Sequence, residues 1–74
     1  MNLGGNWLLW IVVYITQNKE TAMSVKRLLL DAGLLVKVRG IGILSEDQYG
    51  CYEVLLPESE VEEGHSIIIK KTLI

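Results

Sequence analysis

The chain has 74 residues, of which half are hydrophobic, and its formal net charge is −2. A chain of this length forms one small domain that buries about 60% of its unfolded surface, and oligomerisation is a common way for such a domain to gain stability. The slightly acidic balance, with Lys and Arg scattered along the chain, excludes the basic surface that nucleic-acid binding requires.

The densest apolar stretch runs from Trp7 to Ile15 and reads WLLWIVVYI. Such a run, bounded by polar residues, is typical of a strand buried on both faces or nearly so, and we place it at the centre of the core. It is too short to span a membrane, which takes about 20 residues. Residues 1–6 contain Gly4 and Gly5 and are expected to form a flexible tail, so the predicted single domain covers residues 7–74.

A helix is expected from about residue 19 to residue 32. Asn18 is a suitable N-cap residue. Apolar side chains recur at steps of three or four from Ala22 to Ala32, as on one face of an amphipathic helix. Gly33 can adopt the left-handed conformation that ends many helices.

Two strands follow this helix. Residues 34–39, LLVKVR, alternate between an apolar face and a face that carries Lys37 and Arg39. Glycines within residues 40–50 are expected to break this strand and to form a loop. Residues 51–56, CYEVLL, form the third strand, which pairs with the second as a hairpin.

A second helix is expected after Pro57. The acidic stretch Glu58–Glu63 comes first and Lys70 comes near the end, an order that suits the helix dipole. Gly64 in the middle of this helix indicates close packing, because glycine there costs up to about 1 kcal/mol relative to alanine. The alternative, a fourth strand within Ile67–Ile74, stays open.

The predicted element order is therefore β-α-β-β-α. Because the crossover between parallel strands is right-handed, the third strand can lie between the first two and antiparallel to both. The fold class is then α+β, with a three-stranded antiparallel sheet in strand order 1-3-2 and two helices on one face. This is the split β-α-β arrangement of ferredoxin-like folds without its last strand, and it leaves one edge of the first strand unpaired.

Three segments resemble a known family: VVYITQN, LLLDAGLLVKV and EVLLPESEVEEGHSII. They are similar to small bacterial signal-transducing domains of unknown function in the GlnB-like superfamily, which is ferredoxin-like. The resemblance implies this fold and a role in signal transduction, and it brings no catalytic motif. The segment 40–50 is too short to match the long modified loop of the nitrogen-regulatory proteins, so Tyr49 is not expected to correspond to their modified tyrosine.

Residues that could carry catalysis do not gather in the sequence. Cys51 is the only cysteine and His65 the only histidine, and they are far apart in the chain. We find no nucleophile with a base, no paired carboxylates and no set of metal ligands. We therefore expect no enzyme activity, no cofactor and no metal. A single cysteine without a disulfide partner is typical of a reducing compartment, so a cytoplasmic location is expected.

The sheet face without helices is the first candidate surface. We expect Trp10, Val12 and Tyr14 on this face, because Trp and Tyr tolerate a partly wet position; the opposite phase of the first strand is the alternative. An apolar patch with a charged margin usually marks an interface. The predicted interface residues are Trp10, Val12, Tyr14, Leu35 and Leu55.

These features favour a regulatory or interaction module that self-associates, as a homodimer through the first strand or the open sheet face, with a different protein partner left open. The alternative is a small-ligand sensor. It would bind an anionic metabolite or nucleotide between protomers or at the turn before the first helix, where backbone N–H groups can hold an anion. The residues of that turn are Thr16, Asn18 and Lys19.

Overall fold

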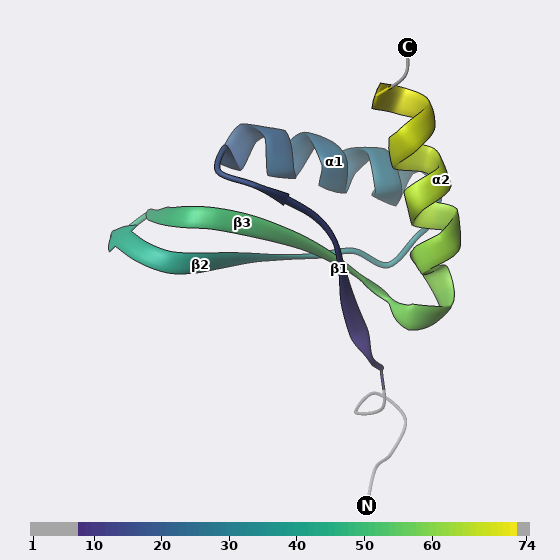
Figure 1. Ribbon diagram of the computed structural model, residues 1–74, viewed down its shortest axis with the longest axis horizontal. Helices are drawn as coiled ribbons and strands as arrows, with labels where there is room; N and C mark the ends of the chain where they lie inside the picture. The colour runs from purple at the N-terminus through teal and green to yellow at the C-terminus, as the bar shows by residue number, and fades with distance from the viewer. Residues whose placement is uncertain (1–7, 73–74) are drawn as a thin grey trace, which may run out of the picture.

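Figure 1 presents the computed structural model of the chain, which describes residues 8–72. Its elements in order are β1 (Trp10–Thr16), α1 (Lys19–Asp31), β2 (Lys37–Ser45), β3 (Gln48–Pro57), the 3-10 turn η2 (Glu58–Glu60) and α2 (Val61–Thr72). The strands form an antiparallel sheet in the order β1-β3-β2, and both helices pack on one of its faces. The predicted α+β class, strand order and helix layer are thus confirmed. The tail expected for residues 1–6, and Trp7, lie outside the described residues.

The central and most buried strand is β3, which pairs with both β1 and β2. Its residues Tyr52, Val54, Leu55 and Leu56 are at most 6% exposed. In β1, by contrast, no residue is fully buried, and Ile15 is 59% exposed. The prediction that the first apolar run is the strand at the centre of the core is therefore wrong. Position in the sheet decides burial, and β1 lies at an edge.

The helices meet the sheet in one hydrophobic cluster. Ala22 and Leu29 of α1 are fully buried, and they join Val54 and Leu56 of β3 and Ile68 of α2 in this cluster. The predicted extent of α1 is confirmed to within one residue at its end. The apolar residues of α1 recur at steps of three and four, so they form one stripe along the helix, and this stripe faces β3.

A Schellman motif ends α1 where glycine was expected. Gly33 has a φ of 87°, its amide donates to the Leu30 carbonyl at 2.9 Å, and the Leu34 amide donates to the Leu29 carbonyl at 3.1 Å. These bonds satisfy carbonyls that the helix itself leaves free. The chain can then turn sharply, which brings Leu34 into the core at 7% exposure.

Gly64 is the point where α2 touches β3. A Cβ added at this glycine would collide with Cδ1 of Leu56, so the close packing predicted for Gly64 is confirmed. The helix continues to Thr72, so the described residues contain no fourth strand after Ile67. Residues 73–74 lie outside the described part of the chain.

The hairpin is longer than predicted. β2 does not stop at residue 39 but passes through Gly40 and Gly42, and only Glu46 and Asp47 separate it from β3. Gly40 is needed because the ring of Tyr49 lies where its Cβ would be. Gly42 has a φ of 74°, which other residues rarely adopt. The glycines therefore mark a close contact and a twist within a strand, and the predicted loop over residues 40–50 is wrong.

Truncating the buried leucine of α1 tests the helix phase. Leu29→Ala should lower the free energy of unfolding by about 2–5 kcal/mol, because a cavity is left in the core. Leu30→Ala, at a position that is 46% exposed, is the matched control and should cost much less. Urea denaturation followed by circular dichroism measures both, and equal losses would contradict the packing.

Adding one methyl group at Gly64 tests the contact with β3. Gly64→Ala should destabilise the protein by about 1–3 kcal/mol through overpacking against Leu56, although alanine is the better helix former by about 1 kcal/mol. Ser66→Ala, at an exposed position of the same helix, should leave stability unchanged or raise it slightly. A stabilised Gly64→Ala variant in thermal denaturation would show that the approach is not close.

Candidate functional site

The open face of the sheet, opposite the helices, is partly closed by its own side chains. Leu55 lies between Val12 of β1 and Lys37 of β2. The Lys37 ammonium is 5.3 Å from the ring centroid of Trp10, so these two side chains reach toward each other across β3. Leu55 is left only 2% exposed, and Trp10 and Val12 are half-buried. The apolar patch predicted from these residues is therefore largely covered within the monomer.

An ion pair occupies the next row of the open face. Glu53 lies opposite Arg39, and its Oε1 accepts hydrogen bonds from Arg39 Nε at 3.0 Å and Nη2 at 2.6 Å. The Arg39 side chain is 50% exposed, so water screens the pair and its contribution to stability is small. Its effect is to make the middle of the open face polar.

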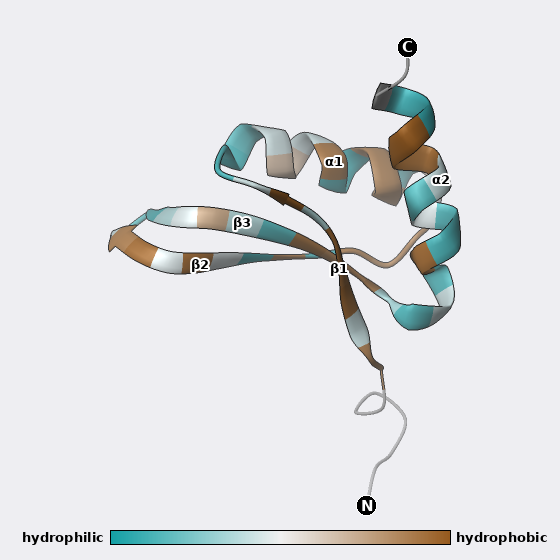
Figure 2. Cartoon of the chain, viewed as in Figure 1, coloured by the Kyte–Doolittle hydropathy of each residue, from teal (hydrophilic) through white to brown (hydrophobic). Residues whose placement is uncertain are grey.

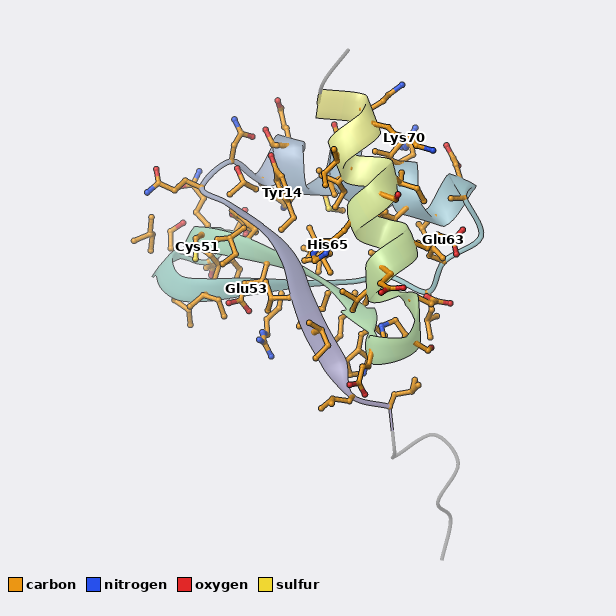
Figure 3. All side chains as sticks on the ribbon, turned by 45° about the vertical axis from the view of Figure 1, so that its right-hand side comes forward. Tyr14, Cys51, Glu53, Glu63, His65 and Lys70 are labelled. Carbon is orange, nitrogen blue, oxygen red and sulfur yellow. The ribbon has the colours of Figure 1, made fainter. Side chains whose placement is uncertain are left out.

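Tyr14 does not lie on the open face. The register between β1 and β3 shifts at Val13, so that Val12 lies opposite Leu55 while Tyr14 lies opposite Val54. This bulge reverses the alternation of side chains, and Tyr14 packs against the core on the helix side (Figure 3). The prediction that these side chains lie on the open face is therefore correct for Val12 and wrong for Tyr14.

Leu35 is the one predicted interface residue that is more than half exposed, at 51%. It precedes β2, and its amide donates to Oε1 of Glu60 in the turn before α2, at 2.9 Å. This bond connects the start of β2 to the helix layer. Leu35 thus lies at the margin of the open face, and its backbone is hydrogen-bonded to the turn before α2.

Ile43 and Leu44, the two most exposed large apolar side chains among the described residues, belong to the far half of β2, which the sequence predicts to be a loop. Ile41, Ile43 and Leu44 are 39%, 77% and 70% exposed, and Figure 2 shows the hydrophobic colour at that end of β2. Within residues 8–72, β2 pairs with β3 alone. We call its outer side, over Lys37–Ser45, the β2 edge. An exposed strand edge with apolar side chains is a template for pairing with another strand.

The turn before α1, the predicted ligand site, is a helix cap whose donors are already bonded. Thr16 Oγ1 accepts from the Asn18 amide at 3.1 Å, and Asn18 Oδ1 accepts from the amides of Glu20 at 2.8 Å and Thr21 at 3.2 Å. These are the N–H groups that an anion at a helix N-terminus would need. The predicted cap role of Asn18 is confirmed. Because Asn18 already accepts from these amides, they are not free to bind an anion.

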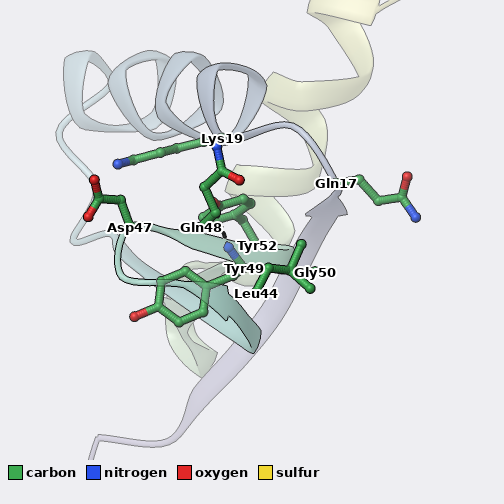
Figure 4. Close-up of a pocket in the computed structure, with 8 residues that line it drawn as sticks. All are labelled: Gln17, Lys19, Leu44, Asp47, Gln48, Tyr49, Gly50 and Tyr52. Carbon is green, nitrogen blue, oxygen red and sulfur yellow. Dashed lines mark hydrogen bonds between the residues drawn. The ribbon is translucent and has the colours of Figure 1, made fainter.

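A hollow lies between the start of α1 and the β2–β3 hairpin (Figure 4). Of the three predicted ligand residues, only Lys19 lines it. The hydroxyl of Tyr52 accepts from the Tyr49 amide at 3.2 Å within this wall. The lining is mixed in charge and polarity, and it consists of Gln17, Lys19, Leu44, Asp47, Gln48, Tyr49, Gly50 and Tyr52.

Groups that could carry catalysis stay apart in the described residues. No three His, Cys, Asp or Glu side chains among residues 8–72 gather where they could hold a metal ion. His65 is exposed on α2, and Cys51 is half-buried in β3 (Figure 3). None of the helices described is long and apolar enough to cross a membrane.

Comparisons of the chain with family models, with curated proteins and with solved structures gave no match. The resemblance to GlnB-like signal-transducing domains therefore stays a prediction from the sequence.

The cap predicts a defined pattern of stability at Asn18. Asn18→Ala should cost about 0.5–2 kcal/mol, because two amides lose their acceptor. Asn18→Asp should retain stability, since a carboxylate accepts the same bonds and favours the positive end of the helix dipole. Chemical denaturation compares the two variants. Equal losses for both would contradict the assignment of Asn18 as a cap.

Proposed function

We propose that the protein is a non-enzymatic regulatory or interaction module that self-associates as a homodimer in the cytoplasm. The observation that supports this best is the row of exposed Ile41, Ile43 and Leu44 on a strand without an outer neighbour among the described residues. A monomer gains nothing from presenting large apolar side chains at a free sheet edge, and such edges are normally blunted or covered.

The size of the chain supports the same proposal. With 74 residues, half of them hydrophobic, the molecule has a small core and more apolar surface than its two helices cover. Burial of that surface against a second copy adds stability without added chain length. Twofold pairing is the commonest closed form of self-association. A signal-transducing role, as the family resemblance implies, fits a module whose partner is another folded chain.

The alternative is a small-ligand sensor for an anionic metabolite or nucleotide. The hollow beside Lys19 supports it, because this lysine lines the hollow together with amide and phenol side chains that can bind a polar ligand. Two observations weigh against it. Asp47 places a negative charge in the same wall, and the amides at the start of α1 are already bonded to Asn18.

Light scattering during size-exclusion chromatography, over a range of micromolar concentrations, tests the proposal. We expect a mass that approaches twice the 8.3 kDa of the monomer as concentration rises. A monodisperse monomer at every concentration would contradict it. A thermal-shift series with nucleotides and amino acids tests the alternative, because a ligand that binds only the folded state raises the Tm.

A further inference from the structure

We propose that the second copy binds at the β2 edge, antiparallel to β2 and with the twofold axis close to Ile41. The two three-stranded sheets would then join into one continuous sheet. This inference rests on the proposed self-association and adds to it the contact surface, the direction of pairing and the register. It also moves the expected contact from β1 to the opposite edge of the sheet.

The two sheet edges differ in their fitness for pairing. β1 has seven residues and is interrupted by the bulge at Val13, and bulges are one of the devices that blunt an edge. β2 has nine residues, and its register with β3 is constant from Lys37 to Ile43, although Gly42 has a φ of 74° and the register shifts between Ile43 and Ser45. Ile43 and Leu44 of β2, at 77% and 70%, are also more exposed than Ile15 of β1, at 59%. A regular strand presents alternate N–H and C=O groups outward, ready to bond a new neighbour.

The alternation of side chains limits the register. Arg39 pairs with Glu53 and Ile41 with Cys51, so Arg39 and Ile41 of β2 lie on the open face. A twofold axis at Ile41 sets this residue against its own copy and places odd residues opposite odd residues. The open faces of both sheets then lie on the same side, and the two copies of Ile41 contact each other across the axis.

The charged residues in and beside β2 favour a register centred on Ile41 over one shifted along the strand. The first half of β2 carries Lys37 and Arg39, and the turn after its last residue carries Glu46 and Asp47. An antiparallel pair centred near Ile41 brings the basic half of each copy toward the acidic turn of the other. A register centred on Val38 would instead set Lys37 opposite the partner's Arg39, and like charges directly opposite each other on paired strands are destabilising.

A single substitution on the β2 edge tests the surface. Ile43 is 77% exposed, so Ile43→Lys should leave the fold intact while raising the dimer dissociation constant by about tenfold or more. Leu30→Lys, on an exposed position of α1, removes a similar apolar side chain elsewhere and should leave that constant unchanged. Sedimentation velocity measures both, with thermal melts to confirm folding. Equal weakening by the two variants, or a dimer indifferent to Ile43→Lys, would overturn the inference.

Disulfide trapping tests the register. In a Cys51→Ser background, which removes the natural thiol beside residue 41, Ile41→Cys should give a covalent dimer on mild oxidation. Directly opposed residues on antiparallel strands have Cα atoms about 4.5–5.5 Å apart, within the range of a disulfide. Ser45→Cys in the same background should not crosslink, because the two copies of residue 45 would be about 27 Å apart at about 3.4 Å per residue.

The outcomes separate the two proposals. One outcome is a dimer in light scattering that Ile41→Cys does not crosslink, or that Ser45→Cys does. Either result overturns the proposed register, and the proposed self-association remains supported. A monomer at every concentration overturns both.

Discussion

The structure depends on the burial of β3 on both of its faces. A three-stranded sheet has only one central strand, and here the residues Val54, Leu55 and Leu56 of that strand are almost wholly removed from water. The helix layer covers one face through the contact of Gly64 with Leu56. On the other face there is no second layer within the described residues, and Leu55 is covered by side chains of the neighbouring strands.

This constraint explains where the apolar surface remains. Trp10 and Lys37 reach across the start of the open face, and the pair of Arg39 and Glu53 makes its middle polar. Beyond that pair β1 has ended, so the rest of the hairpin has no third strand beside it. The exposed isoleucines of β2 lie in this region. The surface proposed for self-association is thus what remains after the chain has covered its own central strand.

Much of the fold could be predicted from sequence because its signals are local. Asn18 and Gly33 delimit α1, and Gly64 marks the close approach of α2. The polar alternation in the second strand also gave the correct face for Lys37 and Arg39. In each case the residue type has one physical role at that position, so the pattern leads directly to the structure.

The candidate site was harder to predict, because its determinants are not local. The bulge at Val13, which turns Tyr14 to the helix side, has no glycine or polar residue to mark it. Gly40 and Gly42 have the pattern of a loop, and only the ring of Tyr49 lying over Gly40 explains why the strand needs a glycine there. Burial of Leu55 depends on side chains from two other strands.

Amide hydrogen exchange by nuclear magnetic resonance, at a low and a high protein concentration, tests most directly whether β2 is the edge that pairs. If it is, alternate amides between Arg39 and Ile43 exchange more slowly at the high concentration, because a second strand accepts their hydrogen bonds. Amides of β1 then exchange at the same rate in both samples. Protection that rises with concentration along Trp10–Thr16, with none gained in β2, would contradict the account.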